Sequence, residues 1–415
     1  MRSAKRAAIL AVFSFGCGFA ADNLMTRGDV RQALDFIGAH ENAQVALQTK
    51  IAEIPAPPFQ EQQRAAAIAA EFRRVHLDRV EIDPAGNVLG WRQGASPRAL
   101  AIAAHLDTVF PPGTDVKVKH AGERLNGPGL VDDSRGLAVI ISLAEALDEA
   151  HIRTRHSLLF VADVGEEGIG NLRGIKYLVG EGRYSGQIDA FISIDGDGTN
   201  CIFHREIGSR RYRVTISGPG GHSFLNFGRV NPAHALGRII ALLANMQVPA
   251  NPKTTYNVGR IGGGTSVNSI PFEVWFEFDM RSEDEQELVR LEQTFLSLVH
   301  RGAAEENGFR AESGTKLTVD AKQIGLRHAI ANSNNTPLVE AMTYAAEAVG
   351  LGKPVLRAGS TDSNAAASAG IPSITVDGGG GAGNLHSLEE WFAPAGSAKG
   401  IEKVLLAILR WDERP

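Results

Sequence analysis

An adjacent pair of acids, Glu166 and Glu167, follows the apolar run Leu158–Ala162. The run is typical of a buried strand, and the two acids then lie at its end. Neighbouring carboxylates repel each other, so a metal ion on one of them would stabilise the arrangement. In that interpretation one acid is a metal ligand and the other is a general base. The alternative is a solvated loop, which is the usual explanation of an isolated Glu-Glu pair.

Further candidate ligands follow strands and glycine-rich loops elsewhere in the chain. Together with the acid pair, the residues in such positions are His105, Asp132, Glu166, Glu167, Asp195 and His386. Nitrogen and oxygen donors without cysteine suit Zn²⁺, and less well Co²⁺ or Mn²⁺. Two histidines and three carboxylates suffice for two metal ions with one bridging carboxylate, which leaves one acid for proton transfer.

Asp107 and Asp133 lie beside these candidates. Residues two apart in a strand share a face, so the Asp107 carboxylate can reach the side of His105 and hold its far ring nitrogen. Without a metal, His105 and Asp107 would be an ordinary loop pair. An acid at a helix start explains one member of Asp132-Asp133 as a cap, but it does not explain both.

Strands alternate with helical patterns around these residues. Short apolar strands are expected at Leu100–Ala104, Leu158–Ala162, Ala190–Ile194 and Ile371–Val376, and helices at Gly136–Leu147, Gly174–Val179, Thr336–Ala348 and Trp391–Trp411. The alternation predicts an α/β sheet, in which ligands bind beyond the carboxyl ends of the strands. The candidate ligands are therefore expected to converge at one edge.

The pattern changes near residue 209. The segment reads as strand, helix, two strands, helix and strand, at Arg211–Ser217, Pro232–Met246, Thr255–Ile261, Glu273–Arg281, Glu283–Glu306 and Ala311–Val319. We therefore predict an α+β (ferredoxin-like) domain at 209–321, inserted into an α/β/α catalytic domain formed by 22–208 and 322–415. A glycine loop of the inserted domain carries His222.

Composition agrees with a folded protein of two domains. The chain has 415 residues, which is long for a single core. Its net charge of −5 gives no basic field that would favour nucleic acid. With two cysteines, Cys17 and Cys201, a disulfide framework is not expected.

Residues 1–21 have the pattern of an export signal. Arg2, Lys5 and Arg6 precede an uncharged run that ends at Ala20, and polar sequence follows. The run is too short for a stable membrane span. The residues before Cys17 differ from the small-residue context of a lipid-modified cysteine, so a lipid anchor is not expected. We therefore predict a periplasmic or secreted protein, against the alternative of a buried N-terminal helix.

Taken together, the motifs resemble the M20 metallopeptidase family of co-catalytic zinc hydrolases, which includes peptidase T, glutamate carboxypeptidases, dipeptidases and aminoacylases. The motifs that carry the resemblance are Ala104–Asp107, Gly127–Asp133, Glu166–Gly168, Ile194–Gly196 and the loop of His386. They occur in the family's order along nearly the whole chain after the signal. One departure is Ser134, two residues after Asp132, where many members have lysine.

The resemblance implies a role for each site residue. Asp132 would bridge two Zn²⁺ ions, with His105 and Asp195 completing one and Glu167 and His386 the other. Glu166 would be the general base and Asp107 the residue that orients His105. His222 would polarise the scissile carbonyl, in many members from the partner subunit, and Arg281 and Asn268 would bind the substrate. The Asp132–Asp133 peptide bond would be cis, and the inserted domain would form a lid or a homodimer contact.

The expected activity is metal-dependent hydrolysis of an amide bond in short peptides. The alternative within enzymes is a deacylase of N-acyl or N-carbamoyl amino acids. A binding protein with a dead site on the same fold is the remaining alternative, and the complete ligand set argues against it. Serine nucleophile chemistry has little support, because no Gly-x-Ser-x-Gly elbow occurs.

Overall fold

The structure is a computed structural model that describes residues 24–198, 200–310, 314–331 and 337–414. The predicted export signal, with Cys17, lies outside the described residues. Within the described part of the chain, no helix is long and apolar enough to cross a membrane.

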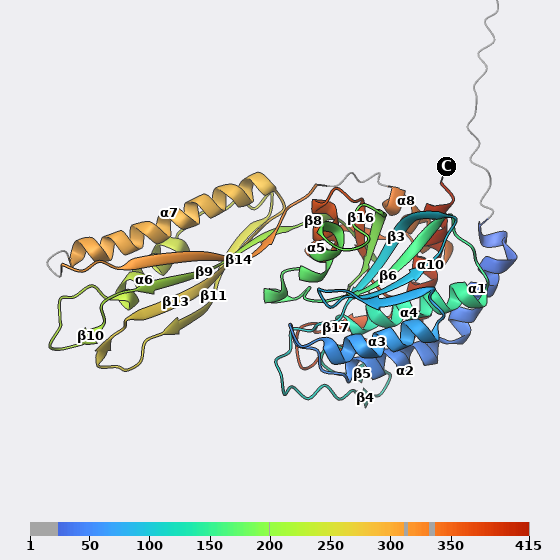
Figure 1. Cartoon of the computed structure of the whole chain (residues 1–415), viewed down its shortest axis with the longest axis horizontal. Coiled ribbons are helices and arrows are strands. Elements are labelled where there is room, and N and C mark those ends of the chain that lie inside the picture. The colour runs from blue at the N-terminus through green and yellow to red at the C-terminus, as the bar shows by residue number, and fades with distance from the viewer. Residues whose placement is uncertain (1–23, 199, 311–313, 332–336, 415) are drawn as a thin grey trace, which may run out of the picture.

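A mixed sheet of eight strands forms the centre of the catalytic domain (Figure 1). Its order is β1-β2-β6-β3-β7-β16-β8-β15, and the central strands β6, β3, β7 and β16 run parallel. The strands are β1 (Arg79–Ile82), β2 (Val88–Arg92), β3 (Ser96–His105), β6 (His156–Asp163), β7 (Ile188–Ile194), β8 (Cys201–Glu206), β15 (Val355–Gly359) and β16 (Ser373–Val376). The predicted α/β sheet is confirmed, although β8 and β15 were not expected.

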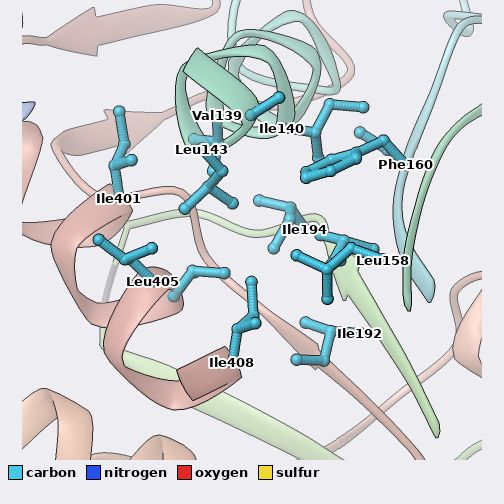
Figure 2. Close-up of a cluster of buried hydrophobic side chains, with 14 of the residues drawn as sticks. Val139, Ile140, Leu143, Leu158, Phe160, Ile192, Ile194, Ile401, Leu405 and Ile408 are labelled. Atoms are coloured by element: carbon cyan, nitrogen blue, oxygen red, sulfur yellow. The ribbon is translucent and has the colours of Figure 1, made fainter. Parts of the chain in front are cut away.

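Helices cover both faces of this sheet. One side carries α1 (Gly28–Ala39), α2 (Glu41–Ala52), α3 (Gln62–Arg74), α4 (Ser134–Glu149), α8 (Pro337–Ala348) and α10 (Ala398–Asp412), and the other carries α5 (Arg173–Gly180) and α9 (Ser363–Ser368). Alternate residues of β3 divide between the two cores, with Ile102 in the first and Ala101 in the second. Figure 2 shows α4 and α10 packing their apolar side chains against Ile192 and Ile194 of β7.

A small antiparallel sheet lies beside the main one, and it includes residues that were predicted to be helical. It contains β4 (Lys119–Ala121), β5 (Arg124–Asn126), β17 (Gly381–Gly383) and β18 (Trp391–Ala393). The expected helix Trp391–Trp411 therefore begins only at Ala398. The first residues pair with β5 and β17 instead, and Pro394 and Gly396 separate that strand from α10.

The inserted domain is an antiparallel four-stranded sheet with two helices and its own apolar core. Its elements are β9 (Gly208–Ser217), α6 (Pro232–Ala244), β11 (Thr254–Gly263), β13 (Glu273–Ser282), α7 (Glu285–Phe309) and β14 (Thr318–Arg327), with the short pair β10 (Gly221–His222) and β12 (Ser269–Ile270). The order β11-β13-β9-β14 is the predicted ferredoxin-like arrangement. Figure 1 shows this domain as a separate lobe, with β10 at the end far from the catalytic sheet.

The last strand of the inserted domain lies further along the chain than expected. We predicted Ala311–Val319, whereas β14 spans Thr318–Arg327 and pairs with β9 over the length of that strand. The pairing of Arg327 with Ser209 requires these later residues. Because several side chains of β14 are polar and half-exposed, its apolar signal in the sequence is weak.

Candidate metal centre

Two histidines contact the Asp132 carboxylate from opposite sides. His105 Nε2 lies 3.0 Å from Asp132 Oδ1, and His386 Nε2 lies 2.7 Å from Oδ2. His386 Nε2 also lies 3.0 Å from Glu167 Oε1. His105 and Asp132 are buried, whereas the His386 side chain is 54% exposed. A carboxylate between two imidazole nitrogens is the arrangement expected of a bridging ligand.

Ligand atoms gather into sets around this carboxylate. The sets whose atoms lie within 4.8 Å of one another are His105–Asp132–Asp195, Asp132–Glu167–His386 and His105–Glu166–Glu167. The first two share Asp132 and divide the five ligands as the family resemblance implies. The structure therefore brings all of the candidate ligands together at the carboxyl edge of the sheet.

The end of β3 and the start of α4 position His105 and Asp132. Asp133 accepts hydrogen bonds from the backbone amides of Gly136 and His105, each at 2.9 Å, so one carboxylate caps α4 and fixes the end of β3. The Asp132–Asp133 peptide bond is cis, as the resemblance implies. Asp132 therefore emerges from a loop that is anchored at its helical end.

Glu390 anchors the other end of the same loop. Its buried carboxylate accepts hydrogen bonds from the amides of Gly129, Val131 and Asp132, at 3.3, 2.6 and 3.2 Å. Burial raises the pKa of Glu390 to about 7, and these amides oppose the rise. No local pattern predicts this contact, because Glu390 lies 258 residues from Asp132 along the chain.

The Asp107 carboxylate contacts the backbone of the acid pair rather than the side chain of His105. Its two oxygens accept hydrogen bonds from the amides of Glu166 and Glu167, each at 3.0 Å. The Asp107 carbonyl oxygen lies 3.0 Å from His105 Nδ1, whereas its carboxylate lies 3.7 Å from that nitrogen. The expected orientation of His105 by the carboxylate is thus replaced by a backbone contact, because the side chain faces the end of β6.

Asp195 and His386 are the remaining candidate ligands. Asp195 follows β7, and its amide donates to the Val376 carbonyl at the end of β16, at 2.9 Å. His386 lies in the loop between β17 and β18 with a φ of 63°, a backbone conformation that is uncommon outside glycine. The glycine-rich loop before it was the signal that identified this residue.

Burial and close contacts shift the pKa values of these side chains. Burial raises the pKa of Glu167 to about 7, and the contact with His386 opposes this. Burial, followed by repulsion from Asp132, holds the pKa of Asp195 well above its usual value. Burial raises the pKa of Asp132, but its close contacts with His105 and His386 outweigh burial and lower the pKa. Hydrogen bonds to Asp132 and Glu167 raise the pKa of His386 to about 11.

These shifts fit a cation site. A divalent cation would compensate the negative charge of these buried acids. His105 Nε2 is buried and makes no hydrogen bond of normal geometry with any described residue, although an Asp132 oxygen lies 3.0 Å away. A nitrogen held close to a carboxylate oxygen without such a bond suits two ligands of one metal ion.

A cavity of about 210 Å³ opens above the ligands. Its lining combines the acids and His386 with Ser360 and three arginines, namely Arg211, Arg281 and Arg327. Arg211 and Arg281 both donate through Nε to Asp279, at 2.9 Å, so this carboxylate aligns the two guanidinium groups. Arg281 was expected near the substrate, whereas Arg211 and Arg327 were missed.

His222 and Asn268 lie outside this cavity. His222 forms the short strand β10 and pairs with Ser269, and Asn268 accepts a hydrogen bond from the Ser223 amide through its carbonyl, at 3.0 Å. Both residues are exposed on the part of the inserted domain that Figure 1 shows far from the catalytic sheet. Within one chain, these two residues are therefore not part of the metal centre.

The model of peptidase family M20/M25/M40 matches residues 101–410. The chain belongs to this family. The matched range begins in β3 and ends in α10, so it includes the five candidate ligands and the inserted domain of this M20 chain.

The M20 chain has distant relatives among known proteins. It is 28% identical to the uncharacterized protein YgeY of Escherichia coli K12 over 179 residues. The matched region covers 41% of this chain and 42% of YgeY. It is 25% identical over 268 residues to succinyl-diaminopimelate desuccinylase of Corynebacterium glutamicum, over 63% of this chain and 70% of that protein. The fold is similar to that of a Staphylococcus aureus tripeptidase, with a TM-score of 0.73 and 21% identity over 90% of this chain and 99% of that structure.

Proposed function

We propose that this chain hydrolyses an amide bond in a short peptide, with water as the nucleophile and two divalent metal ions as cofactors. The observation that carries the proposal is the Asp132 carboxylate, which lies between His105 and His386 and belongs to two sets of ligand atoms. Membership of family M20/M25/M40 supports it. The binding protein with a dead site is disfavoured by the same complete set of ligands.

The residues suit two ions that share one carboxylate. His105 and Asp195 would hold one, Glu167 and His386 the other, and Asp132 both. The mixture of imidazole and carboxylate donors favours Zn²⁺ over Co²⁺ or Mn²⁺. When bound, such a pair supplies Lewis acidity that polarises the amide carbonyl and makes water more acidic.

Glu166 is the proton carrier in this proposal. It lies next to Glu167 at the edge of the cavity, and its backbone amide is fixed by Asp107. Glu166 would accept the proton of the attacking water and donate it to the leaving amine. Asp107 would hold both acids in place through the two amide hydrogen bonds.

Arg281 supports a substrate with a carboxylate. Its Nε donates to Asp279, its side chain is 42% exposed, and it lines the same cavity as the candidate ligands. Its terminal amino groups could therefore bind the carboxylate of a short peptide with two parallel hydrogen bonds. A cavity of about 210 Å³ favours a substrate of two or three residues over a protein.

An N-acyl amino acid is the second candidate substrate. The relative from Corynebacterium glutamicum is named a desuccinylase, which cleaves a succinyl amide. The positive wall formed by Arg211 and Arg281 suits an acyl group that bears a carboxylate as well as it suits a peptide. Hydrolysis of matched dipeptides, tripeptides, N-succinyl amino acids and N-carbamoyl amino acids by the Zn²⁺-loaded protein would separate the two substrate classes.

A homodimer would explain the position of His222. The loops around it expose large apolar side chains, at Phe224, Leu225, Phe227 and Val267. Apolar patches of this kind mark contact surfaces, and we propose that they pack against a second copy. His222 and Asn268 of one chain would then reach the cavity of the partner, where His222 would stabilise the oxyanion. Light scattering of the purified protein tests the expected mass of two chains.

We also propose that the protein is exported. The support is the basic and apolar sequence of residues 1–21. Fractionation of the producing cells and N-terminal sequencing of the mature protein test this. A protein that keeps Met1 and stays in the cytoplasm would contradict the proposal.

A further inference from the structure

The inserted domain contacts the catalytic domain at the segment that carries the acid pair. Three of these contacts are Arg211 Nη1 to the Gly168 carbonyl at 2.6 Å, the Leu326 amide to Asn171 Oδ1 at 3.0 Å, and Lys176 Nζ to the Leu326 carbonyl at 2.7 Å. Burial, followed by repulsion from Arg327 and Arg211, lowers the pKa of Lys176 to about 8. Residues 166–176 thus carry a concentrated set of interdomain hydrogen bonds.

Arg327 makes the closest approach to the proposed base. This last residue of β14 donates from Nη1 to Glu166 Oε1 at 2.9 Å and from Nη2 to the Glu166 carbonyl at 2.6 Å. Nη1 also donates to the Ser360 carbonyl at 2.9 Å. The Arg327 side chain is 4% exposed. One guanidinium group therefore fixes both the backbone and the carboxylate of Glu166.

The chain crosses between the two domains immediately beside this contact. Asn364 of α9 donates to the carbonyls of Ile207 and His328, at 3.0 and 3.1 Å, so one side chain binds both crossing segments. Ile207 directly precedes β9, and His328 directly follows β14. Arg327 consequently lies at the junction of the two domains, where the chain leaves the inserted domain.

We propose that Arg327 is a positioning residue that couples the inserted domain to Glu166. It holds Oε1 and leaves Oε2 to face the attacking water. The orientation of the proton carrier then depends on where the inserted domain sits, so closure of that domain over a substrate sets the geometry of Glu166. The role of Glu166 as the proton carrier rests on the proposed function. The contact by which Arg327 holds Glu166 does not depend on that function.

Binding of substrate by Arg327 is the alternative that the contacts disfavour. Both terminal nitrogens already donate to Glu166, and Nη1 also donates to the Ser360 carbonyl. The remaining nitrogen, Nε, is buried and has no hydrogen-bond partner among the described residues. By contrast, the Arg281 side chain is partly exposed and lines the same cavity. The two arginines are therefore expected to affect different kinetic constants.

Arg327→Met and Arg327→Lys test the coupling, with Arg210→Met as the matched control. Arg210 is also a buried arginine near the start of β9, but its ion pairs are with Glu285 and Glu292 inside the inserted domain. We expect Arg327→Met to lower kcat about 100-fold with KM changed less than about threefold, since a displacement of about 1 Å has that effect on rate. Arg327→Lys should recover part of the loss, because lysine keeps the charge but not the forked geometry. The control should keep the wild-type kcat.

Hydrogen–deuterium exchange of residues 166–176 provides a readout that does not depend on turnover. Arg327→Met should speed exchange there, with bound metal retained and the control unchanged. Unchanged exchange, or faster exchange with a wild-type kcat, would overturn the coupling. If the methionine variant does not fold, the lysine variant decides by the same two measurements. If the wild-type protein hydrolyses no substrate, the proposed function fails, and exchange still decides whether Arg327 holds the segment.

Discussion

Glu166 and Glu167 are sequence neighbours with different surroundings. Glu167 lies 3.0 Å from His386 and shares a set of ligand atoms with Asp132, whereas Glu166 pairs with Arg327 at 2.9 Å. The Asp107 carboxylate holds both backbone amides. The same short segment therefore contains the proposed metal ligand and the proposed proton carrier, and substitution should distinguish them.

Glu166→Gln should keep both metal ions and lose turnover. Glutamine preserves the size of the side chain and an oxygen for Arg327, but it cannot accept the proton of the attacking water. Removal of a general base typically costs about 10²- to 10⁴-fold in rate. Metal content per chain and kcat would be measured for this variant and for Glu167→Gln, which should bind less metal. An active Glu166→Gln enzyme would show that another group moves the proton.

Glu206 predicts a pH dependence of stability. Burial raises its pKa from 4.5 to about 8, and a hydrogen bond from Ser363 opposes the rise. The folded protein therefore keeps a proton that the unfolded chain loses above about pH 4.5. The retained proton contributes fully to stability below that pH, and the contribution is lost as the pH rises to about 8. The free energy of unfolding falls by up to about 1.4 kcal/mol per pH unit in this range.

Glu206→Gln should remove this dependence, because glutamine has no proton to lose and still accepts the hydrogen bond from Ser363. The free energy of unfolding would be measured in urea at pH 5, 6, 7 and 8 with chelator present. We expect the free energy of unfolding of the variant to increase relative to that of the wild type as the pH rises. Parallel curves for the two proteins would mean that Glu206 ionises as easily when folded as when unfolded.

The candidate metal ligands could be predicted because each has a local signal in the sequence. Each of them follows an apolar strand or a glycine-rich loop, and parallel strands bring such ends to one edge. Arg327 has no comparable signal, because its partner Glu166 is 161 residues away. The role of the Asp107 carboxylate was misassigned for the same reason, since its direction depends on how β3 and β6 end side by side.

At the scale of elements, Asp133 joins a helix to a strand. Its carboxylate accepts from Gly136 in α4 and from His105 at the end of β3. Asp133→Ala should lower the free energy of unfolding by about 2 to 4 kcal/mol, the sum of a lost helix cap and an unsatisfied buried amide. Asp284→Ala is the matched control, because Asp284 caps α7 through the Glu287 amide in an exposed position. Equal losses for both variants would contradict the bridging role of Asp133.

Long apolar strands and amphipathic helices were predictable from the sequence, and polar edge strands were not. The buried strands β3, β6 and β7 were recognised because their apolar runs are continuous. β14 was misplaced, since its alternating polar residues acquire meaning only through pairing with β9. β18 was included in a helix because its pairing partner, β5, lies far away along the chain.

At the scale of the whole molecule, the inserted domain determines the assembly that we propose. A catalytic site completed by a second copy predicts complementation between two inactive variants. Glu166→Gln lacks the proton carrier, and His222→Ala lacks the partner's contribution. A mixed dimer contains one site with an intact Glu166 and an intact His222 from the other chain.

Mixing the two variants, with subunit exchange, should therefore restore about a quarter of the wild-type activity, since half of the dimers are mixed and each has one complete site. Either variant mixed with buffer is the control. If mixed dimers form and the activity remains at the level of the separate variants, His222 does not act on the partner.

Metal dependence is the central claim of this account. Protein stripped with a chelator would be titrated with Zn²⁺ while hydrolysis of the peptide and N-acyl amino-acid panel is followed. We predict that the stripped protein is inactive and that the rate rises until about two equivalents per chain are bound, as expected of a two-metal centre. Full turnover by the metal-free protein would contradict the account.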